Sequence, residues 1–76
     1  MEIDGFIQNF ASQYEETDSG VFSAQTKFKD LEEWSSLMAL SIIAMVDEEY
    51  NVAIKGDDIR KSITIEDLYN IIVEKK

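Results

Sequence analysis

The sequence predicts an all-α fold, a small four-helix bundle with three main helices and one short helix. Three segments carry apolar residues at the three- and four-residue spacing of amphipathic helices. Helix-capping residues stand where two of these segments begin. The chain of 76 residues has the size of one domain, so we expect residues 1–76 to form a single domain around one small core.

The first helix is predicted over residues 3–17. Its apolar stripe consists of Ile3, Phe6, Ile7, Phe10 and Tyr14. Acidic Glu2 and Asp4 at its start favour the helix dipole.

Residues 17–34 are interpreted as a long loop. Asp18, Ser19 and Gly20 favour a turn, and neither a helical nor a strand period follows them. Loops of this length are uncommon in compact domains and are often functional. The side chains expected to hold the loop against the core are Phe22, Phe28, Leu31 and Trp34.

The central helix is predicted over residues 36–50. Its core face carries Ala39, Ile42, Ile43, Val46 and Tyr50. At about 100° per residue, its opposite side carries Met38, Ser41, Met45 and Glu48, flanked by Leu37, Ala44 and Glu49. We therefore expect both methionines to face solvent, where flexible thioethers suit varied partners, although single exposed apolar residues are also common without a function.

The last third of the chain predicts a turn and two further helices. Residues 51–56 form the turn, with Val52 and Ile54 facing inward, and residues 57–61 form the short helix. Thr64 is the predicted N-cap of the final helix, with Asp67 in the capping-box position. The final core stripe consists of Ile65, Leu68, Tyr69 and Ile72.

Composition excludes several classes of function. The chain has 16 acidic and 7 basic residues, and its formal net charge of −9 disfavours nucleic acid and anionic lipid surfaces. We expect basic protein partners. No cysteine or histidine is present, and no apolar run approaches the roughly 20 residues that span a bilayer. These features predict a cytoplasmic monomer without membrane insertion.

Two adjacent serines stand where the central helix begins. Ser35 is the predicted N-cap, which leaves Ser36 at the first helical position with an exposed hydroxyl. A catalytic serine needs a neighbouring base, but the chain has no histidine and residues 30–54 contain no lysine or arginine. We therefore expect no enzyme activity. Instead, Ser36 is interpreted as a hydroxyl that another enzyme modifies.

The acidic runs do not have the pattern of a metal site. "DEEYN" and "GDDIR" lack the ligand spacing of an EF-hand loop, so no metal site is expected. The carboxylates are interpreted as a solvated surface that steers a basic enzyme to Ser36. They are Asp30, Glu32, Glu33, Asp47, Glu48 and Glu49.

Across nearly its whole length the chain resembles the acyl carrier proteins, with their peptidyl and D-alanyl relatives. "SSL" at 35–37 is similar to the family's Asp-Ser-Leu motif. "DEEYNVAI" at 47–54 resembles its acidic-aromatic-isoleucine segment, and "SITIEDLYNII" at 62–72 its final helix. The spacing between these segments agrees without a gap. The family usually has Asp before the modified serine, where this chain has Ser35, which retains a capping hydroxyl but no charge.

The resemblance implies a function. Ser36 aligns with the serine that carries 4'-phosphopantetheine from coenzyme A, which would make the chain a phosphoprotein that holds acyl groups as thioesters. The implied partners are a phosphopantetheinyl transferase and acyl-transferring or condensing enzymes with basic docking patches. The expected pathway is a specialised fatty-acid, polyketide or related biosynthesis. The expected docking residues are Ser35, Leu37, Met38, Ser41, Ala44, Met45, Glu48 and Glu49.

Three alternatives stay open at the level of sequence. The chain is a carrier-like interaction module that binds a basic partner and is never modified, or it is modified at Ser35 instead of Ser36. The third alternative concerns the interior, where apolar side chains either fill the space or open slightly to shelter an acyl chain.

Overall fold

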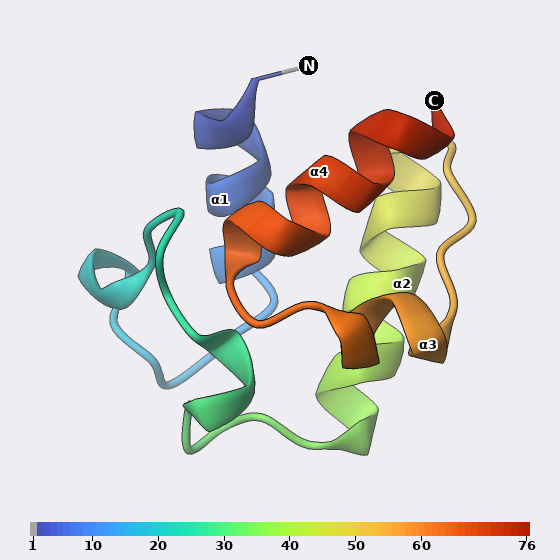
Figure 1. Ribbon diagram of the computed structural model, residues 1–76. Helices are drawn as coiled ribbons and strands as arrows, with labels where there is room; N and C mark the ends of the chain where they lie inside the picture. Colours follow the sequence, from blue (N-terminus) through green and yellow to red (C-terminus); the bar gives the residue numbers. More distant parts are fainter. Residues whose placement is uncertain (1) are drawn as a thin grey trace.

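The computed structural model describes residues 2–76, within which four α-helices form a bundle. They are α1 (Ile3–Ala11), α2 (Ser36–Tyr50), α3 (Gly56–Lys61) and α4 (Ile65–Lys75) (Figure 1). Two short 3₁₀ helices, η1 (Ser19–Val21) and η2 (Phe28–Asp30), lie in the connection between α1 and α2. The predicted all-α architecture, with three longer helices and one short helix, is confirmed.

The core is built from every α-helix. Helix α1 packs against α2 and α4, and α3 packs against α4. The most deeply buried side chains are Phe6, Phe10, Phe28, Ile42, Val46, Ser62, Ile65, Leu68 and Ile72. Burying one large apolar side chain contributes about 1.5–3 kcal/mol, so this cluster is the main source of stability.

Helix α2 has the bounds that the sequence predicts. Ser35 is the N-cap, and its hydroxyl oxygen accepts a hydrogen bond of 3.2 Å from the backbone N–H of Met38. At the other end Asn51 adopts a left-handed conformation with φ of 56°, and its N–H donates to the carbonyl of Asp47. Asparagine tolerates this conformation, so the chain turns sharply after Tyr50.

Helix α1 is shorter than predicted, because it ends at Ala11 and not at residue 17. Tyr14 continues the apolar stripe and is buried, but it lies in a turn after the helix. The next three backbone N–H groups donate to the side chain of Glu33, from the far end of the loop. This long-range contact replaces the hydrogen bonds that would have continued the helix.

The buried face of α2 also differs from the prediction. Met45 is only 4% exposed, and Met38 is partly buried against the core. The predicted solvent exposure of these methionines is therefore wrong. The buried face centres on Ile42, Met45 and Val46, which is a rotation of about 60° around the helix axis from the predicted face.

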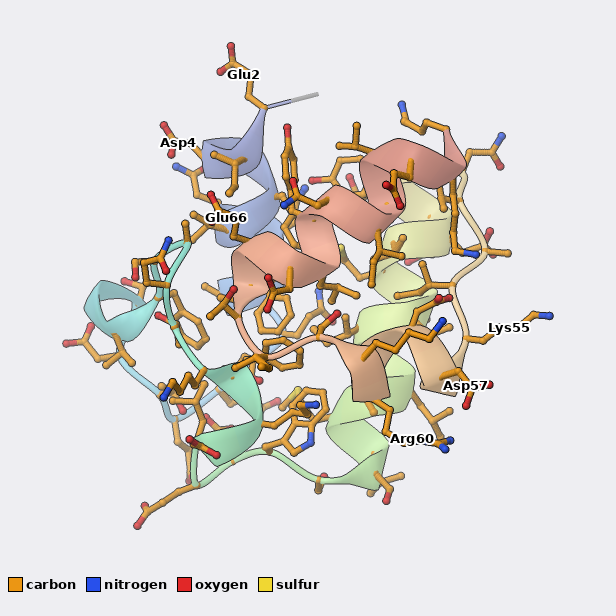
Figure 2. All side chains as sticks on the ribbon, viewed as in Figure 1. Glu2, Asp4, Lys55, Asp57, Arg60 and Glu66 are labelled. Carbon is orange, nitrogen blue, oxygen red and sulfur yellow. The ribbon has the colours of Figure 1, made fainter. Side chains whose placement is uncertain are left out.

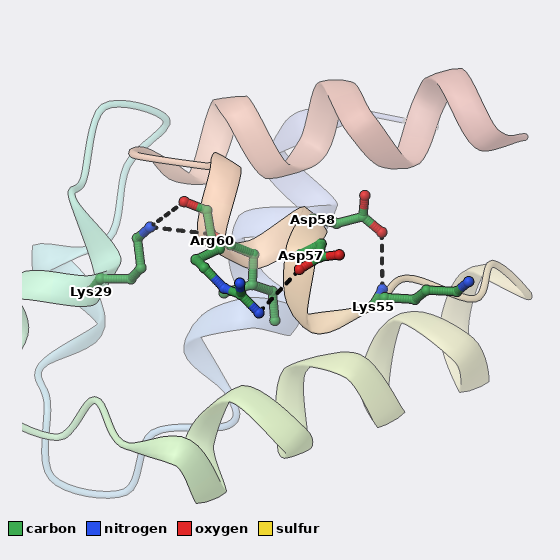
Figure 3. Close-up of polar contacts among 6 residues, drawn as sticks. Lys29, Lys55, Asp57, Asp58 and Arg60 are labelled. Atoms are coloured by element: carbon green, nitrogen blue, oxygen red, sulfur yellow. Dashed lines mark hydrogen bonds and ion pairs between the residues drawn. The ribbon is translucent and has the colours of Figure 1, made fainter.

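The chain that follows α2 adds further side chains to the core. After Asn51 it returns beside α2, and α3 lies between α2 and α4 (Figure 1, Figure 3). This segment brings Val52, Ile54 and Ile59 into the core, which confirms the inward orientation predicted for the first two. The helical period of α2 contains no information about the position of these three side chains.

The loop between α1 and α2 is held as predicted. Phe22 and Phe28 are buried, while Leu31 and Trp34 are partly buried and pack against the core. The Phe28 and Trp34 rings meet edge to face, with centroids 5.1 Å apart. The final helix also follows the prediction, since Thr64 and Asp67 form the capping box and α4 buries Ile65, Leu68 and Ile72.

Contacts from neighbouring elements and its own N-cap hold the short helix α3. The Lys29 ammonium donates to the carbonyl oxygens of Ile59 at 3.2 Å and Arg60 at 3.0 Å, at the C-terminal end of α3 (Figure 3). At the other end, the backbone N–H of Lys55 donates to the Asp58 carboxylate at 2.9 Å. The Lys75 ammonium nitrogen, from α4, lies 3.6 Å from Oδ2 of the same carboxylate.

Candidate functional site

Ser36 is the first residue of α2 and is exposed. Its neighbour Ser35 supplies the capping oxygen, so the Ser36 hydroxyl lies outside the cap. The N-terminal end of a helix carries a partial positive charge, which favours a negative group nearby. The local structure therefore presents an exposed serine at the positive end of the α2 dipole.

The structure separates the predicted docking residues into exposed and buried sets. The exposed ones are Ser35, Leu37, Ser41, Ala44, Glu48 and Glu49. Met38 is partly buried, and Met45 lies in the core, where a partner cannot touch it without opening the fold. Met45 is therefore removed from the candidate docking surface.

One exposed apolar residue on this surface was missed by the sequence analysis. Leu40 is 61% exposed, and Leu37 is 76% exposed. Together with Ala44 they follow a helical spacing of three and four residues, so they share one side of α2. We call Leu37, Leu40 and Ala44 the exposed apolar stripe. The spacing was visible in the sequence, but leucine favours burial and gave no sign that Leu40 faces solvent.

Carboxylates follow this stripe at the C-terminal end of α2. Asp47, Glu48 and Glu49 are all exposed, and the last turn has no basic residue. Negative charge at a helix C-terminus is unfavourable because it meets the negative end of the dipole. The ion pairs found within residues 2–76 join Arg60 to Asp57 and Lys75 to Asp58, so they do not neutralise this run.

Further acidic side chains lie at the edge of the molecule. Glu2 and Asp4 point away from the body at the start of α1, as does Asp57 on α3 (Figure 2). Basic groups are fewer, and Arg60 is held in an ion pair of 3.0 Å with Asp57. The chain therefore carries more negative than positive charge, with a formal net charge of −9.

The segment that leads to Ser36 is fixed by an unpredicted contact. The Glu33 carboxylate accepts hydrogen bonds from the backbone N–H groups of Glu15 (3.2 Å), Glu16 (3.0 Å) and Thr17 (2.6 Å). The Thr17 hydroxyl donates a fourth at 2.6 Å. We call this arrangement the Glu33 clamp. The partners are 16 to 18 residues from Glu33, so no local pattern in the sequence could have revealed it.

The Glu33 clamp changes the electrostatics of its members. The hydrogen bond from Thr17, supported by the three backbone donors, lowers the pKa of the Glu33 carboxyl group below its usual value. Burial, followed by the negative charge of Glu33, raises the pKa of the Tyr14 hydroxyl. Glu33 is therefore charged and Tyr14 neutral at physiological pH.

The described residues contain no preformed metal or ligand chamber. Within residues 2–76, no three carboxylates are grouped closely enough to hold a metal ion. The same residues enclose no pocket. The Ser36 hydroxyl and the exposed apolar stripe lie on the surface of α2.

No family model, curated protein or solved structure matches the chain. Among residues 2–76, none of the helices combines the length and apolar character needed to cross a membrane.

Proposed function

We propose that the chain is a carrier protein, not an enzyme, whose Ser36 bears a covalent 4'-phosphopantetheine arm. One observation carries the proposal: Ser36 is exposed at the first position of a 15-residue helix, while Ser35 makes the cap. A structural role for the serine pair needs only one hydroxyl, so the second is available for modification. The resemblance of the segment 35–37 to the carrier motif supports the same assignment.

The residues present fit such a group. The Ser36 hydroxyl is accessible, and the helix N-terminus favours the negative charge of a phosphodiester. When bound, the arm supplies the thiol that holds an acyl group as a thioester, which this chain without cysteine cannot supply itself. Because residues 2–76 enclose no pocket, the acyl group stays outside unless α2 and its neighbours separate.

The exposed apolar stripe and the carboxylates at 47–49 would form the docking surface. Leu37 lies directly after Ser36, so a partner that covers the stripe also reaches the modified side chain. The partners are a phosphopantetheinyl transferase and acyl-transferring or condensing enzymes with basic patches next to apolar ones. Opposite charges on the chain and its partner accelerate their association, and salt screens this attraction. Such weak binding suits brief transfer of an acyl group between cytoplasmic enzymes of a specialised acyl or polyketide pathway.

The decisive experiment is the intact mass of the protein after incubation with coenzyme A and a broad-specificity phosphopantetheinyl transferase. We expect a gain of one phosphopantetheine in the parent and in Ser35→Ala, and none in Ser36→Ala. Ser35→Ala serves as the matched control because it removes the adjacent hydroxyl. Loss of the gain only in Ser35→Ala would assign modification to Ser35. No gain in the parent with several transferases would contradict the carrier proposal.

A second candidate is an interaction module that is never modified. The observation that favours it is that the docking surface itself, the exposed apolar stripe with Glu48 and Glu49, does not require the Ser36 hydroxyl. This module predicts that Ser36→Ala supports the pathway as well as the parent. Under both candidates, replacing Glu48 and Glu49 with lysine should weaken binding to a basic partner. Unchanged affinity and salt dependence would remove the acidic part of the docking surface.

A further inference from the structure

We infer that Glu33 is a positioning residue for the modification of Ser36, and that it acts through the Glu33 clamp. This inference rests on the proposed function, since it concerns the enzyme that attaches the arm. It adds a claim that the function does not contain: the turn at residues 15–17, far from Ser36 in sequence, helps to set the geometry in which the Ser36 hydroxyl is presented.

The Glu33 clamp contains four hydrogen bonds. Three consecutive backbone N–H groups and one hydroxyl converge on a single carboxylate, at 2.6 to 3.2 Å. A carboxylate offers about four acceptor positions, so four donors match its capacity, with three of them on Oε1 and one on Oε2. Hydrogen bonds to a charged acceptor are about twice as strong as neutral ones. The Glu33 clamp therefore holds both ends of the loop between α1 and α2.

The path from Glu33 to Ser36 is short. Only two residues intervene, and each is fixed by its own contact. Trp34 packs edge to face on buried Phe28, and Ser35 caps α2 through the backbone N–H of Met38. An anchor at Glu33 therefore restricts the entry of the chain into α2 without a flexible spacer.

The alternative is that Glu33 attracts the transferase by its charge. Thr17 separates the two explanations. Its hydroxyl donates a hydrogen bond of 2.6 Å to the Glu33 carboxylate and carries no charge. Replacing Thr17 with valine removes this donor and keeps every carboxylate. Serine at the same position keeps the hydroxyl. If Glu33 acts by its charge, neither substitution changes the rate of modification. If Glu33 acts by positioning, Thr17→Val lowers the rate and Thr17→Ser does not.

The test measures transfer of phosphopantetheine by steady-state kinetics, with the carrier as the varied substrate. The variants are Glu33→Ala, Thr17→Val and Thr17→Ser, with Glu74→Gln as a control that removes an exposed carboxylate of α4. Amide hydrogen exchange at residues 15–17 reports the Glu33 clamp directly. Acrylamide quenching of Trp34, the only tryptophan, reports the segment before Ser36. Circular dichroism checks that each variant is folded.

Misplacing a reacting group by about 1 Å can cost up to about 100-fold in rate, so a partial loss of order is expected to cost less. We expect Glu33→Ala to lower kcat on the order of tenfold, with KM for the carrier changed less. Thr17→Val should have a smaller effect in the same direction, and Thr17→Ser should match the parent. The rate of amide hydrogen exchange at residues 15–17 and the acrylamide quenching of Trp34 fluorescence should both rise in the variants with lower kcat.

Three outcomes overturn the inference while the proposed function stands. In the first, exchange at residues 15–17 is unchanged in Glu33→Ala, so no Glu33 clamp exists in solution. In the second, exchange rises but kcat stays at the value of Glu74→Gln, so the Glu33 clamp serves stability alone. A rise of KM without a fall of kcat, insensitive to Thr17→Val, would assign Glu33 to charge attraction instead. Absence of any transfer to the parent would overturn both proposals.

Discussion

Tyr14 carries a polar group in an unfavourable position. Its ring packs between Phe10 and Phe22, with centroids 5.8 and 4.8 Å away. Its hydroxyl oxygen is the one buried side-chain polar atom in residues 2–76 that lacks a hydrogen-bond partner. Leaving a buried hydroxyl unsatisfied costs about 1–3 kcal/mol. The aromatic packing must offset this cost.

We therefore predict that Tyr14→Phe stabilises the protein. Removing the hydroxyl should raise the free energy of unfolding by about 1 kcal/mol, measured by urea denaturation. Tyr50→Phe is the matched control, because the Tyr50 hydroxyl accepts a hydrogen bond of 2.8 Å from the Asn9 side chain. This control should lower the same free energy. If Tyr14→Phe is as destabilising as Tyr50→Phe, the Tyr14 hydroxyl has a partner in solution.

Glu33 also makes stability depend on pH. Hydrogen bonds in the Glu33 clamp, that of Thr17 first, lower the pKa of this carboxyl in the folded state. A carboxyl with a lowered folded pKa contributes its stability above its unfolded pKa, about 4.3, and loses it as pH falls through the folded pKa. We expect the stability difference between parent and Glu33→Gln to be full at pH 7 and to shrink below about pH 4.

Urea denaturation of both proteins from pH 7 down to pH 3 measures this difference. Comparison of the pair cancels the titration of the other carboxylates, which change in both proteins. A difference that is constant over this range would show that Glu33 titrates normally and that the Glu33 clamp does not favour the charged form.

At the level of elements, α2 shows what the sequence contains. Its predicted bounds were correct because the signals are local: an apolar period, a serine cap before Ser36 and an asparagine after Tyr50. The same local signals placed Ser36 at the exposed first position of the helix. The cap of α4 at Thr64 was correct for the same reason.

The predictions were wrong where contacts with segments distant in the sequence determine the structure. The helix predicted over residues 3–17 followed the apolar period through Tyr14, but α1 ends at Ala11. The backbone N–H groups of residues 15–17 donate to the Glu33 carboxylate and not to a preceding turn of helix. Met45 was assigned to solvent because the return of residues 51–61 beside α2 was unknown. Contacts between segments far apart in sequence are absent from helical periodicity, so neither feature was predictable.

The cap of α2 allows a direct test. We expect Ser35→Ala to lower the free energy of unfolding by about 1 kcal/mol, because the backbone N–H of Met38 loses its acceptor. Ser35→Asp should retain most of the stability, since Asp is also a good N-cap. Ser36→Ala is the control, and its effect should be small because Ser36 is exposed and makes no cap. Equal losses in Ser35→Ala and Ser36→Ala would contradict this assignment of the cap. Urea denaturation measures all three.

At the scale of the whole molecule, the net charge of −9 opposes folding. Like charges repel more strongly in the compact state than in the unfolded chain. The ion pairs found in residues 2–76 are few, and the one between Asp57 and Arg60 is highly exposed. Such exposed pairs are usually worth less than about 1 kcal/mol, so repulsion should dominate the effect of salt.

We predict that salt stabilises the protein. Raising ionic strength from about 0.01 to about 0.15 M shortens the screening length from about 30 to about 8 Å, which weakens the repulsion. The free energy of unfolding, from urea denaturation at both salt concentrations, should therefore rise. In a Glu48→Lys, Glu49→Lys variant the rise should be smaller, because the net charge is less negative. A fall with salt in the parent would show that attractive pairs dominate.

The contacts of Lys29 with α3 have a consequence for the order of folding. Helices shorter than about 12–15 residues are marginal in water, and α3 has six residues. Its carbonyl groups at Ile59 and Arg60 depend on a lysine from η2, and Asp58 lies near a lysine from α4. We therefore expect α3 to become ordered only once η2 and α4 are in place, and to open locally before the three longer helices do.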